Sequence, residues 1–283
     1  MSKRAVHELL VVFKDDLRQG LTSPLTLFLA VSYLLFSLLI TLPYVALSRL
    51  LMEKLATEPG GASAAAALQV AGTTMWSQAF TQLTGSPEEG LALASVPLPA
   101  LYTFFFASFI VPLLAVLLSS DLVADDLRTG HMRYLTLRCG RETLLGGRLL
   151  SRCLLLAATT LLGTGISFAL FAVRLTDLSP SAYVHFLRYG LFLAGSAVVY
   201  AALAALCSTL VRSAFFALVL GIFLLLIFGV VDMASDVLGW ATPNAYKLLL
   251  FSPNRWPQGL AAYLGFATLY AGAAWLRLRT RDL

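Results

Sequence analysis

The sequence has 283 residues, of which 59% are hydrophobic and only 12% are charged, and its mean hydropathy is +0.82. Soluble domains carry about 25% charged residues, so this chain lacks the polar surface of a soluble domain, and we expect a single transmembrane domain over residues 1–283. The net charge of +5 does not indicate a nucleic-acid partner, because the basic residues fall between apolar stretches and form no single patch.

The first segment, residues 3–19, has the pattern of an amphipathic helix. One helical face is apolar and consists of Val6, Leu10, Phe13 and Leu17, while the opposite face is basic. A basic amphipathic helix directly before a membrane span is expected to lie in the plane of the membrane interface.

Six apolar stretches are long enough to cross the hydrocarbon core as helices. We expect these spans at about residues 25–47, 99–120, 153–173, 189–211, 213–232 and 258–276. The first span is too long for a signal-peptide core and lacks a small-residue cleavage site, so we expect it to be retained. Residues 211–213 alone separate the fourth and fifth spans, which therefore form a helical hairpin. The predicted fold class is an all-α integral membrane protein with six transmembrane helices and an N-terminal interfacial helix.

The basic residues predict the orientation of these spans. With a cytoplasmic N-terminus, fourteen of the twenty Lys and Arg residues fall on the cytoplasmic side. Cytoplasmic segments of membrane proteins are enriched in Lys and Arg. An even number of spans returns the C-terminus to the cytoplasm, as its basic tail also favours.

Two outer loops have distinctive compositions. In residues 49–98, the stretch Ala64–Leu83 forms either a helix on the outer surface or a mobile loop, and the sequence does not decide between them. Residues 233–257 contain Trp240, Tyr246 and Trp256, which suit the aromatic belt of a membrane protein. A short re-entrant or surface helix is expected between the prolines of this second loop.

No catalytic, cofactor or metal site is expected from the motifs. The sequence has no G-x-x-x-x-G-K-[ST], G-x-S-x-G or H-E-x-x-H. Its histidines, His7, His131 and His185, fall in separate segments on both sides of the membrane. Asp232 and Asp236, at the outer end of the fifth span, are interpreted as an interfacial pair in contact with water rather than as a proton relay.

The segment after the second span has a recognisable order of residues. An acidic stretch that ends at Asp126 leads to Gly130, an apolar pattern, Arg141 and then Gly147-Arg148 at the start of the next span. The chain also closes on Arg-Asp-Leu at residues 281–283. In these features, and in its six spans and long first outer loop, the sequence resembles ABC-2 type transporter permeases. Its architecture is closest to the permeases that serve multicopper-enzyme maturation.

The resemblance implies a half-transporter of the bacterial inner membrane, which would dimerise with a second copy or a paralogue and engage separate cytoplasmic ATPase subunits. Export is the direction that the family favours. Residues 121–148 would be the cytoplasmic coupling loop, in which Asp125 and Arg128, three residues apart, brace a short helix or pair with the ATPase. The implied ATPase-docking residues are Asp121, Asp125, Asp126, Arg128, Gly130 and Arg141.

Three other functional classes stay open at this point, one of which is a non-transport membrane scaffold, which would show no transport under any condition. A proton-coupled carrier would transport without any ATPase, and a membrane-embedded lipid-modifying enzyme would need polar catalytic groups that converge within the spans. The apolar composition of the spans weakly favours a lipidic cargo, but lipid-facing helices have the same composition. The sequence therefore does not identify the substrate.

Overall fold

The structure is a computed structural model that describes residues 3–57, 98–174, 180–234, 239–247 and 255–280, together with a few isolated residues elsewhere. These described residues are almost all helical and include no strand. The stretch Ala64–Leu83, for which a surface helix or a mobile loop was expected, lies largely outside them.

The helices follow one another in a simple order. They are α1 (Lys3–Thr22), α2 (Pro24–Thr57), α5 (Leu98–Ser119), α6 (Ala124–Thr129), α7 (His131–Arg138), α8 (Arg141–Arg174), α9 (Pro180–Leu210), α10 (Ala214–Ala234), the 3-10 helices η1 (Gly239–Ala241) and η2 (Pro243–Tyr246), and α11 (Trp256–Thr280). Within the described part of the chain, six of them (α2, α5, α8, α9, α10 and α11) are long and apolar enough to cross a membrane. The predicted fold class is therefore confirmed.

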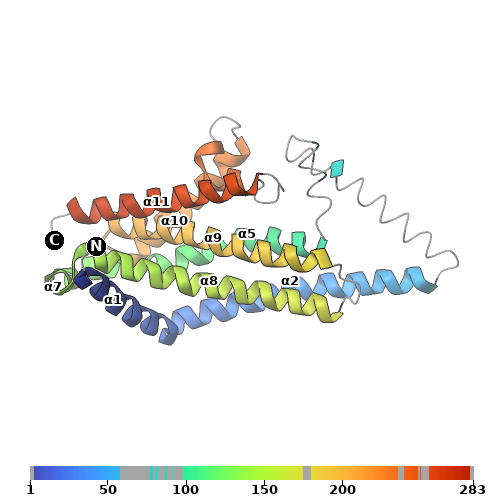
Figure 1. Ribbon diagram of the computed structural model, residues 1–283, viewed down its shortest axis with the longest axis horizontal. Helices are drawn as coiled ribbons and strands as arrows, with labels where there is room; N and C mark the ends of the chain where they lie inside the picture. Colours follow the sequence, from blue (N-terminus) through green and yellow to red (C-terminus); the bar gives the residue numbers. More distant parts are fainter. Residues whose placement is uncertain are drawn as a thin grey trace.

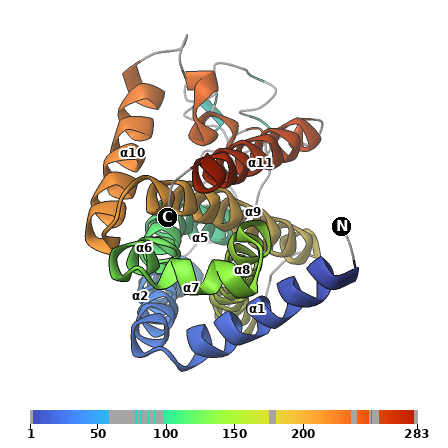
Figure 2. The ribbon, with the colours of Figure 1, turned by 90° about the vertical axis from the view of Figure 1, so that its left-hand side faces the viewer.

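Helices α2, α5, α8, α9 and α11 run along the long axis of the molecule (Figure 1), whereas α10 is inclined to that axis and is seen along its length in the end-on view (Figure 2). We call the end of this bundle at which α1 begins and α11 ends the terminal end, and the other end the opposite end. The short helices α6 and α7 lie across the terminal end, and α1 runs obliquely beside it (Figure 2). All three short or amphipathic helices are thus gathered at one end of the bundle.

Helix α9 forms the centre of the bundle and contacts α5, α8, α10 and α11. In its most apolar stretch 78% of the residues are buried, against 11% in α10. Its inward positions include several alanines, among them Ala197, Ala201 and Ala205, and small residues let neighbouring helices approach closely. By contrast, Phe215, Phe216 and Phe223 of α10 are more than half exposed, as expected of a helix that faces lipid.

Helix α8 begins earlier than the third predicted span. The sequence placed residues 121–148 in a loop and began the span at residue 153, whereas α6, α7 and the first turns of α8 occupy this region. Hydropathy misses the first turns of α8 because Arg141, Arg148 and Arg152 lie in them. These arginines contact other elements of the chain, as described below.

Candidate functional site

The candidate site is the coupling segment, residues 121–148, which links α5 to α8 at the terminal end. Its two short helices meet at Gly130, which has a φ of 72°. This left-handed backbone conformation is open to glycine but strained for other residues. Gly130 therefore ends α6 and begins α7, and it sets the angle between them.

The N-terminus of α6 is held by a side chain of another helix. The backbone N–H groups of Val123 and Ala124 donate to Oγ of Ser208, at 2.8 and 2.9 Å. All three residues are buried. The first N–H groups of a helix have no partner within the helix, and here α9 supplies the acceptor that α6 lacks.

Helix α7 is anchored by one face. Met132 is 1% exposed and belongs to a small hydrophobic core at the terminal end, which is separate from the main core between the spans. The other buried members of this terminal core are Leu122, Val123, Leu144, Leu145, Ala205, Ala274 and Leu278. They come from the residues before α6 and from α8, α9 and α11, so the coupling segment packs against three spans.

Two arginines on α8 hold the coupling segment, and one of them also contacts α1. Arg148 donates to the carboxylate of Asp126 and, at 2.7 Å, to the carbonyl oxygen of Leu122. Arg152 lies 3.7 Å from the carboxylates of both Asp16 on α1 and Asp121 before α6. The side chain of Arg152 is only 12% exposed, so its charge acts in a place where solvent screening is weak.

A third arginine connects α8 to α11. The guanidinium of Arg141 donates to the carbonyl oxygens of Leu278 and Arg279, each at 3.2 Å. The last carbonyl groups of a helix have no partner within it, and a cation near them is also favoured by the helix dipole. Arg141 thus holds the end of α11 against the start of α8.

The residues expected to dock an ATPase fall into two groups. Asp121, Asp126 and Arg141 contact other parts of this chain, as described above. Asp125 and Arg128 instead pair with each other across one turn of α6, at 3.6 Å, and their side chains are 53% and 65% exposed. This second group is the more exposed of the two, and in the first group the side chain of Asp121 is 43% exposed.

The sequence analysis missed Asp16, Arg152 and Ser208 as parts of this site and treated Arg148 only as a motif residue. A signal was available for the arginines, because Arg148 and Arg152 are four residues apart and therefore share one face of a helix. No comparable pattern marks Ser208, whose role depends on the placement of α6 against α9.

Helix α1 packs closely on α8 through a glycine. A Cβ atom added to Gly147 would lie 2.9 Å from Cγ1 of Val12 and 3.1 Å from the carbonyl oxygen of Leu9. One helical turn further along α8, the hydroxyl of Ser151 donates to the carboxylate of Asp16. The contact face of α1 therefore includes Leu9, Val12 and Asp16.

This contact face is offset from the apolar face that the sequence indicated. Of the four residues named there, Phe13 and Leu17 are partly buried, whereas Val6 and Leu10 are 43% and 54% exposed. The amphipathic helix itself is present as predicted. Its apolar stripe is divided between α8 and the exterior, which suits a helix at a membrane interface.

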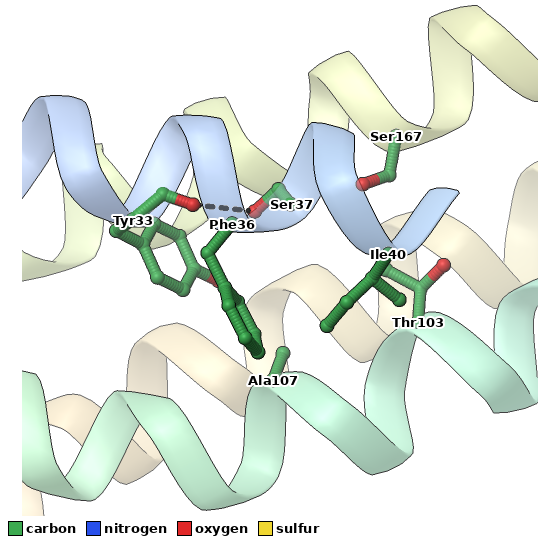
Figure 3. A pocket seen from close by; sticks show the side chains of 7 residues that line it. All are labelled: Tyr33, Phe36, Ser37, Ile40, Thr103, Ala107 and Ser167. Atoms are coloured by element: carbon green, nitrogen blue, oxygen red, sulfur yellow. Dashed lines mark hydrogen bonds between the residues drawn. The ribbon is translucent and has the colours of Figure 1, made fainter. Parts of the chain in front are cut away.

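A narrow cleft lies among α2, α5 and α8 in the middle of the bundle. Figure 3 shows its lining, which consists of Tyr33, Phe36, Ser37, Ile40, Thr103, Ala107 and Ser167. Its volume is about 10 Å³, the space of one water molecule. Beside it the hydroxyl oxygens of Thr41 and Ser167 are 3.0 Å apart. The cleft has hydroxyl groups in its wall, but it is too small for a cargo.

Toward the opposite end, residues 239–247 pack into the bundle as two 3-10 helices. The hydroxyl of Tyr200 donates to Oδ1 of Asn244 at 2.8 Å, and Nζ of Lys247 donates to the carbonyl oxygen of Ser108 at 3.3 Å. Tyr200 is ten residues, or about 15 Å, from the terminal end of α9 at Leu210, which is half of the hydrocarbon thickness. Irregular backbone at such a depth is tolerated where protein surrounds it.

The 3-10 helix η2, with Pro243 as its first residue, lies where a short re-entrant or surface helix was expected, and the position of this helix relative to the membrane stays a prediction. Trp240 is 66% exposed, as an aromatic-belt residue would be. Asp232 is exposed near the end of α10, while Asp236 lies outside the described residues. Among the described residues, no group of three or more His, Cys, Asp or Glu is placed to hold a metal ion.

Comparison with known proteins gives one match. A family model described as ABC-2 family transporter protein matches residues 10–264. The matched region begins within α1, includes the whole coupling segment and ends within α11. No curated protein matches the sequence.

Proposed function

Since the chain belongs to the ABC-2 family of transporter proteins, we propose that it is the permease subunit of an ATP-binding cassette transporter whose energy comes from a separate cytoplasmic ATPase. The observation that carries this proposal is the coupling segment, a pair of short helices outside the spans that is joined to α1, α8, α9 and α11. When a partner displaces such a segment, these contacts can transmit the displacement to the spans.

The separate ATPase is inferred from what the sequence lacks. A nucleotide-binding loop of the form G-x-x-x-x-G-K-[ST], whose backbone N–H groups surround the phosphates, does not occur in it. We therefore assign ATP hydrolysis to a partner and no enzymatic activity to this chain.

The terminal end is assigned to the cytoplasm of a bacterial inner membrane. It carries most of the basic residues, and cytoplasmic segments are enriched in Lys and Arg. The basic residues of the described chain at this end include Arg4, Lys14, Arg18, Arg128, Arg133, Arg138, Arg141, Arg148, Arg152, Arg212, Arg277 and Arg279. In this orientation the coupling segment faces the compartment that contains ATP.

The translocation path is assigned to a dimer of this permease with a second copy or a paralogue. The cleft among α2, α5 and α8 holds about one water molecule, so a path wide enough for cargo requires walls from a second subunit or a rearrangement of the spans. The remaining apolar surface, such as that of α10, is covered by membrane lipid. Export is assigned as the direction because the permeases that this sequence resembles favour it.

The coupling mechanism follows from the contacts at the terminal end. A displacement of α6 by the ATPase would move α9 through Ser208 and α8 through the pair of Asp126 and Arg148. Arg152 would carry the same displacement to α1 through Asp16. Because these contacts are buried or nearly so, the elements would shift as one unit.

The proposal is tested by ATP hydrolysis in lipid nanodiscs that hold the purified chain with its co-purifying P-loop ATPase. We expect vanadate-sensitive hydrolysis that differs several-fold between the ATPase alone and the complex. Transport in proteoliposomes on a proton gradient without nucleotide would instead identify a carrier. Conversion of a membrane lipid by the chain alone would identify a lipid-modifying enzyme.

A further inference from the structure

Lys247 brings a positive charge to the middle of the bundle. Its Nζ donates to the carbonyl oxygen of Ser108 on α5 at 3.3 Å and lies 5.5 Å from the ring centroid of Phe109. Ser108 lies eleven residues before the end of α5 at Ser119, or about 16 Å, which is half of the hydrocarbon thickness. When the spans cross a membrane, the ammonium group is therefore close to the bilayer middle, where charged side chains are rare and usually functional.

The carbonyl group of Ser108 explains why a hydrogen-bond donor is needed at this place. In an α-helix this carbonyl would accept from the N–H of the residue four positions later, which is Pro112. Proline has no N–H, so α5 leaves the oxygen without its helical partner, and the side chain of Lys247 donates to it. A neutral amide or hydroxyl group would satisfy the same oxygen, so this contact accounts for the donor but not for its charge.

The contacts of Lys247 compensate its charge only in part. Its bond to Ser108 is 3.3 Å long, which is beyond the range of about 2.7–3.2 Å for most N–H···O bonds. Asp232 on α10 acts on Lys247 electrostatically, but in the part of the chain that the structure describes no carboxylate forms an ion pair with Lys247. Charges away from water are usually paired, so this site suits an anion that comes from another molecule.

We propose that Lys247 binds the negatively charged group of an amphipathic cargo during its passage through the membrane. This inference rests on the proposed function and names the class of its substrate. Asn244 lies three residues before Lys247 and therefore shares one side of η2 with it. Tyr200 donates to Oδ1 of Asn244, and the N–H groups of the same amide can donate to the bound anion.

The depth of Lys247 selects a moving cargo over a resident lipid. The head groups of bilayer lipids lie at the two surfaces, about 15 Å from the bilayer middle, so only their acyl chains reach this depth. Residues 239–247 lie between α10 and α11 (Figure 2), and η2 contacts both helices. Lys247 is partly exposed, so a ligand has access to it.

The test uses hexadecyl phosphate that carries a diazirine next to its head group, and hexadecanol with the same diazirine as the neutral probe. Each probe is crosslinked to the full chain in a non-ionic detergent, and the labelled peptides are identified by mass spectrometry. We expect the phosphate probe to label residues 243–247 at least about tenfold more than the neutral probe.

Three variants show whether the charge of Lys247 causes this preference. Lys247→Arg should retain the preference, because it keeps the charge. Lys247→Gln should lose it, although its amide can still donate to the carbonyl of Ser108. Lys14→Gln is the matched control, because it makes the same change at an exposed position on α1, and it should retain the preference. Equal labelling by the two probes, or an unchanged preference in Lys247→Gln, would overturn the inference.

ATP hydrolysis separates this inference from the proposed function. In nanodiscs that hold the chain with its ATPase, hexadecyl phosphate should change the rate several-fold in the wild type and in Lys247→Arg, but not in Lys247→Gln. An equal response of Lys247→Gln and the wild type would overturn the inference and leave the proposed function standing. Charge-dependent labelling of a chain that has no ATPase partner would remove the proposed function, and with it the role of the bound molecule as cargo.

Discussion

Arg152 is the residue that joins α1 to the coupling segment, and its two carboxylate partners make its contribution measurable. Without Arg152, the carboxylate of Asp16, whose side chain is only 12% exposed, would lie near that of Asp121 with no cation between them. We predict a coupling energy of about 1 kcal/mol between Asp16 and Arg152 in a double-mutant cycle of thermal stability in detergent, using Asp16→Asn and Arg152→Met.

The matched control is the pair of Arg4 and Glu8 on the same helix. It has a shorter contact, 2.9 Å, but Arg4 is 86% exposed. Exposed pairs of this spacing contribute only about 0.3–0.5 kcal/mol. Equal coupling energies in the two cycles would show that burial gives Arg152 no special role.

Ser208 is the second residue whose removal has a definite consequence. Ser208→Ala would leave the buried N–H groups of Val123 and Ala124 without their acceptor. An unsatisfied buried polar group costs about 1–3 kcal/mol, so we predict a lower melting temperature and faster hydrogen exchange in α6. Ser196→Ala on the same helix is the control, because its hydroxyl bonds to a carbonyl of its own helix. If both variants have the same melting temperature and the same hydrogen exchange in α6, Ser208 does not cap α6.

Among the elements, α1 depends on the absence of a side chain at Gly147. Gly147→Ala should push α1 away from α8, because the added Cβ would approach Val12 and the backbone of Leu9 too closely. At Gly146 the nearest atom, Cδ1 of Leu9, would be 3.5 Å away, which is ordinary van der Waals contact. Alanine in a helix is favoured over glycine by about 1 kcal/mol, so Gly146→Ala should be neutral or stabilising.

Hydrogen exchange of α1 distinguishes the two glycine variants. We expect faster exchange over α1 in Gly147→Ala and unchanged exchange in Gly146→Ala. If hydrogen exchange over α1 in Gly147→Ala is equal to or slower than in the wild type, the packing of α1 on α8 does not depend on Gly147.

These helices also show how much of the fold could be predicted from the sequence. Six spans and an amphipathic first helix were predictable, because hydropathy and helical periodicity depend only on local composition. The contact face of α1 was not, since the apolar residues Val6 and Leu10 look alike whether they meet lipid or protein. Asp16, which contacts Ser151 and Arg152 of α8, is a charged residue, so the apolar pattern of the helix does not indicate this contact.

The sequence indicated which segment forms the candidate site, but not which of its residues contact one another. The acidic stretch and Gly130 marked residues 121–148 as the candidate segment, and the structure adds that Gly130 has a left-handed backbone conformation. The pairing of Asp126 with Arg148, which are 22 residues apart, required knowledge of how α6 packs on α8.

At the scale of the whole molecule, the assigned orientation gives a labelling prediction. In a chain whose native cysteines are replaced by alanine, Leu137→Cys, at an exposed position on α7, should react with a membrane-impermeant maleimide only in inverted membrane vesicles. Trp240→Cys, at an exposed position toward the opposite end, should react only in intact cells with a permeable outer membrane. The reverse pattern would place the terminal end outside and would contradict the assignment.

The central claim, that this permease works with a separate ATPase, is tested most directly by affinity purification of the tagged chain from its native membrane in a mild detergent. We predict that a protein with a P-loop co-purifies in a fixed ratio to the chain and that the complex hydrolyses ATP. Recovery of the intact, folded chain without any ATPase, under several mild detergents, would contradict it.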